Sequence, residues 1–209
     1  MKTDKLGQAK KDEMANILFK IDALEFGVFK LSSGKASPYY VDLRVIPSFP
    51  DAFREICEFY AENITSKIGL KNFDRIAGVP MTGIIFASQV AYNLRKPFIF
   101  VRKGVRTHGR ERRVEGILTS GDRVLLVDDL VTTGLTLKKA AEAVRAEGGV
   151  VTDAVIFLDR EEGEAKLLEK AGLKLHPLLK MSEVANTLYD TGAIDQESLK
   201  TILKQVKKR

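Results

Sequence analysis

The stretch that most constrains the fold of this chain is residues 123–136, RVLLVDDLVTTGLT. Its four apolar residues, 124–127, predict a buried parallel strand, and Asp128 and Asp129 follow directly. A turn of threonine and glycine then leads into a helical pattern that begins at Leu135. The N–H groups of such a turn suit a phosphate, and adjacent carboxylates suit the vicinal hydroxyls of a ribose. The stretch therefore predicts a sugar-phosphate site at a strand end.

Two common phosphate-binding motifs do not describe this stretch. It has no lysine of a Gly-x-x-x-x-Gly-Lys-Ser/Thr loop, and it lacks the spacing of Gly-x-Gly-x-x-Gly. The alternative interpretation is an ordinary strand-to-helix turn with a polar cap.

The order of apolar patterns predicts one large α/β protein. Strands are expected at residues 28–31, 39–43, 75–79, 98–102, 123–127, 150–158 and 174–179, and helices at residues 14–26, 50–68, 83–94, 135–147, 161–171, 182–189 and 196–206. Alternation of strands and helices favours a doubly wound parallel sheet, whose ligands bind beyond the carboxyl ends of the strands. Arg102, Asp128 and Asp159 all lie at the carboxyl ends of predicted strands, so one cleft is expected to gather them.

Composition and charge exclude several other classes of protein. The 209 residues are 44% hydrophobic and 30% charged, and they contain no apolar run of the roughly 20 residues that span a bilayer. The N-terminal residues lack the apolar core of a signal peptide, so a cytoplasmic location is expected. The single cysteine, Cys57, excludes an internal disulfide and a cysteine-rich metal site. The net charge of +6 is concentrated in residues 102–113 and at the C-terminus, without the interleaved aromatic residues of a single-strand binder.

Two segments resemble known signatures. Residues 123–136 resemble the phosphoribosyl-pyrophosphate (PRPP) signature of the type I phosphoribosyltransferases. Residues 29–44, FKLSSGKASPYYVDLR, resemble the more specific N-terminal signature of the orotate phosphoribosyltransferases, Ser-Gly-x-x-Ser-Pro followed by an aromatic residue and Asp-x-Arg. In that family this segment forms a hood over the pyrimidine. Ser32 stands where one common form of the signature has lysine, and Lys35 is the alternative contact.

Three further segments extend the resemblance. Residues 102–116 resemble the family's flexible catalytic loop, because Arg102, Lys103 and His108 match it and Arg106 stands where lysine is common. Residues 78–84 resemble the pyrophosphate loop, with Thr82 in place of a frequent lysine. Arg160 follows the 150–158 strand, where the family places an arginine that pairs with the carboxylate of orotate. For the basic loop and for Arg160, each taken alone, a solvated surface role is the simpler interpretation.

The resemblance implies an orotate phosphoribosyltransferase of pyrimidine (UMP) biosynthesis, on the type I phosphoribosyltransferase fold. The expected catalytic residues are Arg102, Lys103, Arg106, His108, Asp128 and Asp129. These six residues are also expected to bind PRPP, together with Thr82, Leu130, Val131, Thr132, Thr133, Gly134, Leu135 and Thr136. The residues expected to bind orotate are Ser32, Lys35, Tyr39, Tyr40, Thr132 and Arg160. Mg²⁺ is expected to be held mainly by PRPP, so no metal site made only of protein ligands is expected.

The resemblance also implies an arrangement of the chain. Residues 1–209 are expected to form a single phosphoribosyltransferase domain, with a hood at about 1–45, the mobile loop at about 102–116 and a helical extension at about 181–209. A homodimer with shared active sites is expected, without nucleic acid or membrane partners. Resemblance to the fused UMP synthases also points to association with an orotidine 5′-monophosphate decarboxylase.

Two other functions remain as alternatives. One is a purine phosphoribosyltransferase, which the hood segment disfavours. The other is a regulator that keeps the fold and senses PRPP or a nucleotide, which the basic tail permits. The intact catalytic loop and the absence of a helix-turn-helix pattern disfavour the regulator.

Overall fold

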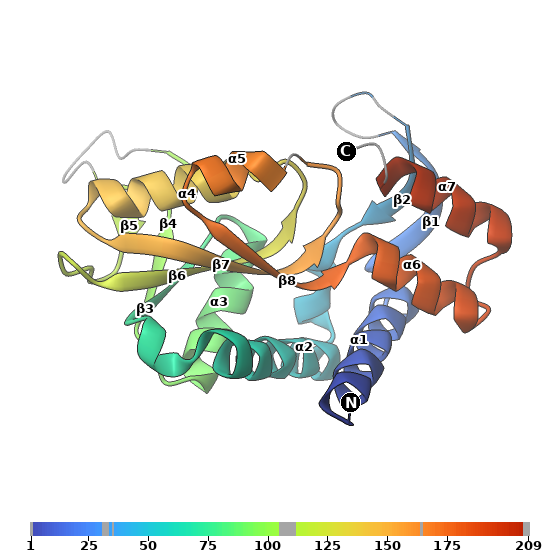
Figure 1. The fold of residues 1–209 in the computed structure, drawn as a ribbon, viewed down its shortest axis with the longest axis horizontal. Coiled ribbons are helices and arrows are strands. Elements are labelled where there is room, and N and C mark those ends of the chain that lie inside the picture. The colour runs from blue at the N-terminus through green and yellow to red at the C-terminus, as the bar shows by residue number, and fades with distance from the viewer. Residues whose placement is uncertain (1, 31–33, 35, 105–111, 164, 207–209) are drawn as a thin grey trace. The chain divides into compact units, whose positions relative to one another are not determined.

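The computed structural model describes residues 2–30, 34, 36–104, 112–163 and 165–206 (Figure 1). The chain divides into two compact units. The first unit consists of residues 1–56, 159–162 and 179–209, and the second consists of residues 57–158 and 163–178. The division into one domain with a hood and a helical extension, expected from the sequence, stays a prediction.

Most residues of a six-stranded sheet belong to the second unit. Its strands are β3 (Arg75–Gly78), β4 (Phe98–Val101), β5 (Val114–Glu115), β6 (Arg123–Val131), β7 (Val150–Asp159) and β8 (Lys174–Lys180). They lie in the order β5-β4-β3-β6-β7-β8. β3 runs parallel to both β4 and β6, whereas the short β5 is antiparallel to β4. The parallel, doubly wound architecture is therefore confirmed, and β5 is an addition that its two residues were too few to predict.

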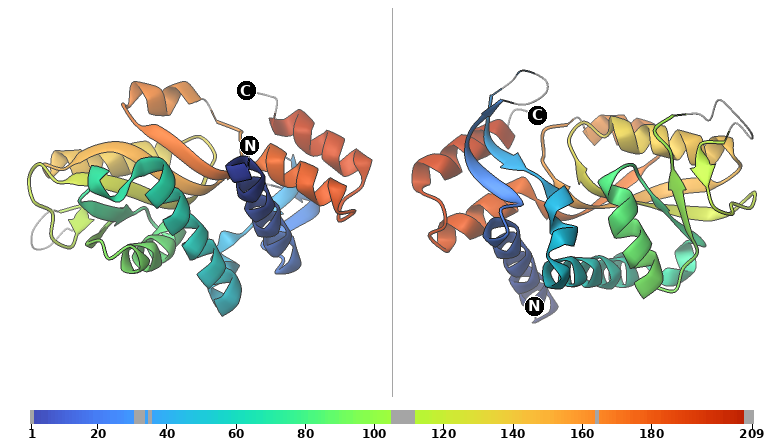
Figure 2. Two further views of the ribbon diagram at one scale, coloured as in Figure 1. Left: turned by 60° about the horizontal axis from the view of Figure 1, so that its bottom comes forward. Right: turned by 180° about the vertical axis from the view of Figure 1, so that it is seen from behind.

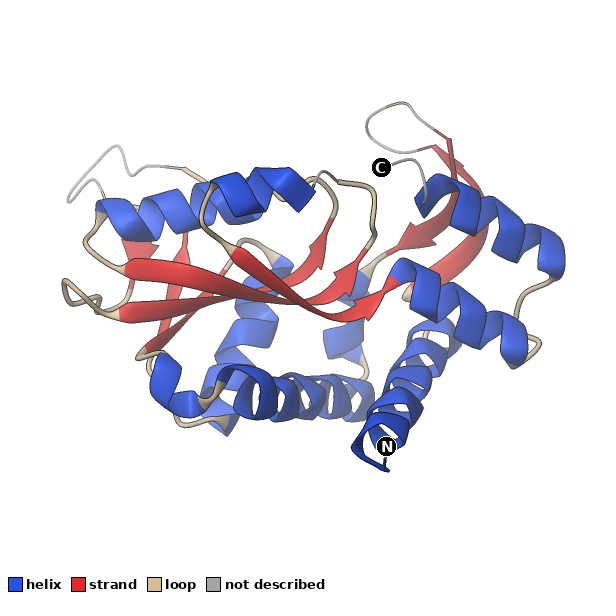
Figure 3. Ribbon diagram, viewed as in Figure 1, coloured by secondary structure: helices blue, strands red, loops and turns tan. Residues whose placement is uncertain are grey.

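Helices cover both faces of this sheet. α3 (Thr82–Asn93) packs on β3 and β6 from one side, and α4 (Leu135–Ala146) packs from the other, where α5 (Ala165–Lys170) lies beside it (Figures 1 and 3). The strand order reverses at β3, because the chain passes from β3 to β4 on one side and later returns to β6 on the other. The carboxyl ends of β3 and β6 therefore form a topological switch point, where ligands of such sheets bind.

Apolar strands and helix faces form the core of the second unit. Leu126 and Ile156 from the sheet and Leu137 and Val144 from α4 are almost inaccessible to solvent. The near-continuous apolar runs of β6 and β7 are what burial on both faces requires. This core holds the carboxyl ends of the strands in place.

The first unit contains a hairpin and most of the remaining helices. Its elements are α1 (Lys2–Lys20), β1 (Leu24–Lys30), β2 (Ala36–Val41), the 3-10 helix η1 (Leu43–Ser48), α6 (Met181–Asp190) and α7 (Gln196–Val206). β1 and β2 pair antiparallel, α7 lies against β2, and α6 contacts both α1 and α7 (Figure 2). α2 (Pro50–Asn63) passes from this unit into the second, where two short helical turns, η2 (Ile64–Ile68) and η3 (Leu70–Asn72), follow it.

The structure corrects three of the boundaries expected from the sequence. The first helix ends at Lys20 and not near residue 26, because Asp22 takes a left-handed conformation (φ 55°) and Ala23 N–H donates to the Leu18 carbonyl (2.9 Å). The helix expected over 161–171 begins only at residue 165. This helix begins later than expected because a turn precedes it, in which Glu161 has φ 55° and donates its N–H to Asp159 Oδ1 (2.7 Å).

The third correction concerns the strand before the two aspartates. β6 continues to Val131, so Asp128 and Asp129 lie within it and do not follow it. Over the part of the chain that is described, no helix combines the length and apolar character needed to cross a membrane.

Candidate active site

Asp128 and Asp129 lie in different environments near the end of β6. Asp128 is only 5% exposed, whereas Asp129 is half-buried. Each carboxylate accepts the next backbone N–H, since Asp128 Oδ1 accepts from Asp129 (2.9 Å) and Asp129 Oδ1 accepts from Leu130 (2.9 Å). These bonds hold both side chains beside the backbone of β6.

Gly83 explains how Asp128 comes to be buried. A Cβ at Gly83 would collide with the Asp128 carboxylate and would stand 2.8 Å from Asp128 Cα. Only glycine allows the first turn of α3 to approach β6 so closely. The neighbouring Thr82, which was expected to contact PRPP, is itself 8% exposed. The loop after β3 and the end of β6 therefore meet at the switch point.

Burial changes the electrostatics of this site. The pKa of Asp128 lies well above its usual value, first because the carboxyl is buried and then because Asp129 lies beside it. Tyr60, which is fully buried, donates its hydroxyl to the Asp128 carbonyl (2.6 Å). Burial also raises the pKa of Tyr60, so its hydroxyl keeps its proton and remains a donor. Sequence analysis did not identify Tyr60, because it is one of several apolar-face residues of α2.

The residues after β6 form the turn that the sequence predicts before Leu135. Gly134 has φ 81° and is the N-cap of α4, and Leu135 N–H lies 3.5 Å from Thr133 Oγ1. Thr133 and Thr136 are exposed, and Thr132 is half-buried. The N–H groups in the first turn of a helix have no intrahelical acceptors, so this turn presents donors and a positive dipole end to an anion.

Gly163 supports this turn from the segment after β7. A Cβ at Gly163 would collide with the Thr132 carbonyl, and it would stand 2.9 Å from Thr133 Cα. Position 163 therefore requires glycine, because only a residue without a Cβ lets its backbone come so close to the backbone of the turn. Sequence analysis did not identify Gly163, although it follows the paired glutamates at the end of the 150–158 strand.

Arg102 and Lys103 begin the basic segment directly after β4. Arg102 Nη1 donates to Glu115 Oε1 (2.9 Å), and Arg102 N–H donates to the Arg113 carbonyl (2.8 Å). Glu147 Oε1 accepts from the N–H groups of Arg113 (2.8 Å) and Val114 (2.9 Å). The two ends of the segment are thus joined, and Lys103 is exposed.

Arg106 and His108 lie outside the described residues, as do Ser32 and Lys35. Their expected roles stay predictions.

Two of the residues expected to bind orotate, Tyr39 and Arg160, both donate to the carboxylate of Glu162. Arg160 is 8% exposed, its guanidinium lies 4.9 Å from the centre of the Tyr39 ring, and its Nη2 donates to Glu162 Oε1 (2.9 Å). Tyr39 is fully buried and donates its hydroxyl to the same oxygen (2.6 Å). Burial raises the pKa of this hydroxyl, which therefore stays protonated. Arg160 Nε is buried and has no hydrogen-bond partner within the described part of the chain.

Tyr40 lies in a different environment from Tyr39. Its ring is 36% exposed and packs 5.6 Å from that of Phe29, and Arg44 Nη2 donates to its hydroxyl (3.2 Å). Adjacent residues of a strand point to opposite faces, so the two tyrosines of β2 cannot present their rings to a ligand from the same side.

Known proteins resemble this chain in sequence and in fold. Residues 50–175 match the model of the phosphoribosyl transferase domain. The chain is 40% identical over 191 residues to the orotate phosphoribosyltransferase of Cenarchaeum symbiosum, covering 91% of this chain and 96% of that protein. It is 40% identical over 179 residues to the orotate phosphoribosyltransferase of Sulfolobus acidocaldarius, covering 86% and 88% of the two chains.

Solved structures of an orotate phosphoribosyltransferase and of a UMP synthase also resemble this chain. The crystal structure of the orotate phosphoribosyltransferase from Aeropyrum pernix matches with a TM-score of 0.75 and 30% identity, over 87% of this chain and 99% of that chain. The UMP synthase of Leishmania donovani matches with a TM-score of 0.82 and 30% identity, over 94% of this chain and 42% of that one. The chain therefore belongs to the phosphoribosyl transferase family and, within it, to the orotate phosphoribosyltransferases.

Proposed function

We propose that this chain transfers the phosphoribosyl group of PRPP to orotate, giving orotidine 5′-monophosphate and pyrophosphate. The observation that carries the proposal is the aspartate pair of β6, which lies at the switch point of the sheet and directly before the N-terminal turn of α4. The bond between the anomeric carbon and the pyrophosphate oxygen breaks as the bond from that carbon to a ring nitrogen of orotate forms, and the proton on that nitrogen is released to water or to the departing pyrophosphate. Positive charge develops on the ribose in this displacement, and negative charge develops on the departing pyrophosphate.

The residues of the second unit are assigned to PRPP. Asp128 and Asp129 accept hydrogen bonds from the ribose hydroxyls, and the turn 132–136 receives the 5′-phosphate through its N–H groups. Thr82 and the cations Arg102 and Lys103 are assigned to the pyrophosphate. Fixed cations stabilise the charge that develops on this leaving group.

Mg²⁺ fits the proposed site as a companion of PRPP. The aspartate pair offers only oxygen ligands, which Mg²⁺ prefers, but two carboxylates cannot complete its octahedral shell. The remaining ligands would be oxygens of the substrate and water. The metal would neutralise charge on the pyrophosphate, while Asp128 and Asp129 orient the ribose.

One assay tests the proposed function. Loss of orotate is followed by ultraviolet absorbance with PRPP and Mg²⁺, beside parallel reactions with adenine, guanine and uracil. Consumption of orotate alone is expected. Preferred use of adenine or guanine would assign the protein to the purine enzymes. Absence of turnover with every base, despite measurable binding of PRPP, would favour the regulator.

Arg160→Ala is expected to raise the KM for orotate about tenfold or more and to leave the KM for PRPP within about twofold. Loss of a hydrogen bond to a charged partner costs about 1.5–3 kcal/mol, which corresponds to this change. The buried, unpartnered Nε of Arg160 supports an anionic ligand at this position. Steady-state kinetics with each substrate varied in turn measures the effect. A change confined to the KM for PRPP would contradict the assignment.

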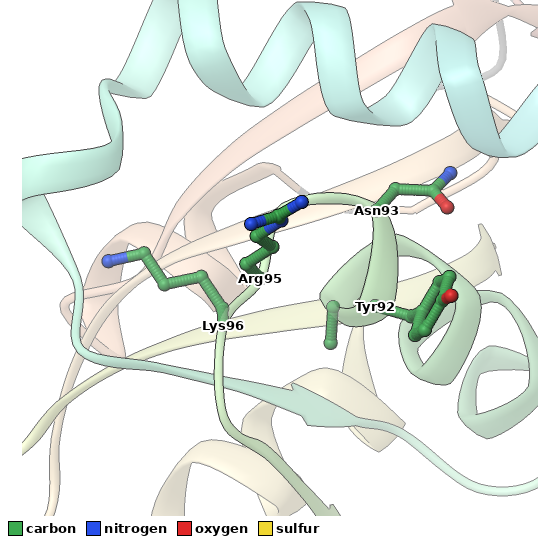
Figure 4. Close-up of a pocket in the computed structure, with 5 residues that line it drawn as sticks. Tyr92, Asn93, Arg95 and Lys96 are labelled. Atoms are coloured by element: carbon green, nitrogen blue, oxygen red, sulfur yellow. The ribbon is translucent and has the colours of Figure 1, made fainter.

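We also propose a homodimer, which an apolar stripe along α3 and its N-cap residue supports. The stripe consists of Met81, Ile85 and Tyr92, which are 69%, 43% and 79% exposed. Spacings of four and seven residues place them on one face of the helix. Beside Tyr92, a hollow lined by Ala91, Tyr92, Asn93, Arg95 and Lys96 lies at the carboxyl end of α3 (Figure 4). A second copy of the chain that packs here would bury the stripe from solvent.

Ile85→Glu is expected to convert the dimer into a monomer, because the substitution would bury an unpaired carboxylate in the interface. Light scattering coupled to size exclusion measures the mass. Val150→Glu is the matched control, since Val150 is 47% exposed and lies at the start of β7. An Ile85→Glu protein that remains dimeric would place the interface elsewhere.

The cytoplasmic location and the association with a decarboxylase stay predictions.

A further inference from the structure

Glu162 is the centre of a hydrogen-bond cluster that the sequence did not reveal. Its Oε1 accepts from the Tyr39 hydroxyl (2.6 Å), from Arg160 Nη2 (2.9 Å) and from Gln205 Nε2 (2.7 Å). Gln205 belongs to α7, and its Nε2 also lies 3.3 Å from Ser37 Oγ on β2. One oxygen thus joins the hairpin, the turn after β7 and the last helix of the first unit. We name these four residues, Tyr39, Arg160, Glu162 and Gln205, the Glu162 cluster.

The cluster fixes the guanidinium of Arg160 in orientation. Glu162 holds Nη2 from one edge, and the Tyr39 ring lies against the guanidinium at 4.9 Å. The side chains of Arg160 and Glu162 are only 10% and 19% exposed, so water screens this ion pair weakly. Because a guanidinium is planar, contacts that fix one edge and one face also fix the directions in which its remaining N–H groups point. One of these groups, Nε, is buried without a partner in the described residues.

We infer that Glu162 is a positioning residue that orients Arg160 toward the carboxylate of orotate, and that Gln205 of α7 acts with it. This inference rests on the proposed function, because it assigns Arg160 to the substrate. Oε1 of Glu162 already accepts from three donors, so this oxygen acts on the substrate through Arg160 and not by direct contact. The last helix thereby contributes to recognition of orotate through one amide, although sequence analysis assigned it no functional residue.

Glu162→Ala removes the acceptor of the cluster and is expected to raise the KM for orotate about tenfold, leaving the KM for PRPP within about twofold. Gln205→Ala is expected to raise the KM for orotate about threefold, because Glu162 keeps its other two donors. Glu162→Gln retains a side-chain oxygen that accepts from the same donors, so its KM should lie between those of the wild type and Glu162→Ala. Gln196→Ala, an exposed glutamine at the start of α7, is the matched control for Gln205 and should behave as the wild type.

The decisive experiment is a double-mutant cycle between Arg160 and Glu162. If Glu162 acts through Arg160, the variant with both Arg160→Ala and Glu162→Ala should bind orotate no more weakly than Arg160→Ala alone. Calorimetric titration of orotate in the presence of pyrophosphate gives the Kd of each variant, and thermal unfolding identifies variants that have lost their fold. Retention of the wild-type KM for orotate by both Glu162→Ala and Gln205→Ala would overturn the inference.

Additive losses in the cycle would also overturn it, because Glu162 would then act independently of Arg160. These outcomes differ from failure of the proposed function, which would appear as a wild-type protein that neither binds nor consumes orotate. That result would overturn both. If Glu162→Ala unfolds, Glu162→Gln and Gln205→Ala provide the same cycle with smaller perturbations.

Discussion

Replacing Asp128 and Asp129 together by asparagine is expected to lower kcat/KM for PRPP by about 10²–10⁴-fold while the fold remains intact. Each carboxylate is assigned hydrogen bonds to the ribose, and loss of a charged partner costs about 1.5–3 kcal/mol per bond. Two such losses give the expected decrease in rate. Steady-state kinetics and circular dichroism measure the two properties, and Asp190→Asn, at an exposed position of α6, is the control. Comparable turnover in the double variant with an unchanged spectrum would reject the assignment.

The same substitution at Asp128 alone is expected to stabilise the protein at neutral pH. Folding raises the pKa of this buried carboxyl above its ordinary value of 3.8, so the folded state holds the proton more tightly than the unfolded state. Stability contributed by Asp128 therefore falls as the pH rises from the unfolded pKa through the folded pKa. Asparagine keeps an Oδ1 that accepts from Asp129 N–H and carries no charge to bury. A gain of about 1 kcal/mol would raise Tm by about 2–4 °C.

This gain in Tm should disappear below about pH 4, where both states of the wild-type carboxyl are protonated. Thermal unfolding of Asp128→Asn and wild type between about pH 3 and pH 8 measures the difference. A Tm for the variant below that of the wild type at pH 7 would contradict the burial of an ionisable group here. We therefore expect a variant that is more stable but less active, because the buried carboxylate serves binding at a cost to the stability of the folded state.

Two inactive variants are expected to regain activity when they exchange subunits. One carries Arg106→Ala with His108→Ala, and the other carries Asp128→Asn with Asp129→Asn. We propose that the basic loop of each subunit completes the site of its partner, so a mixed dimer has one site with all four substitutions and one with none. Random exchange makes about half of the dimers mixed, and each of these has one intact site of two. Activity should therefore return to about a quarter of the wild-type value.

Turnover of each variant alone, of the mixture before exchange and of the mixture after exchange measures this effect. Subunits with different affinity tags show by co-purification that mixed dimers have formed. If verified mixed dimers remain inactive, each loop acts within its own subunit and the shared-site proposal is wrong. The expected quarter follows from two-fold symmetry, and the proposed role of the loop rests on the charge of residues 102–113, since Arg106 and His108 lie outside the described residues.

Local patterns in the sequence predicted the architecture and the residues that we assign to PRPP. Apolar runs separated by helical periodicity predicted the doubly wound sheet, because strands buried on both faces must be apolar throughout. The threonine and glycine residues before Leu135 predicted the turn at the start of α4, because glycine adopts the left-handed conformation observed at Gly134. The aspartates and the basic segment were found in the same way. These features depend on residues that are neighbours in the chain.

Only the tertiary structure decided which of these residues are buried and what they contact. Asp128 is buried because Gly83, 45 residues earlier, admits α3 against β6, and no local pattern predicts that approach. Glu162 accepts hydrogen bonds from Tyr39 and Gln205, whose positions differ from it by 123 and 43 residues. Such contacts depend on how distant segments pack, and packing fixes both the pKa of Asp128 and the orientation of Arg160. The sequence predicted the candidate site residues, whereas the fold set their electrostatics and their partners.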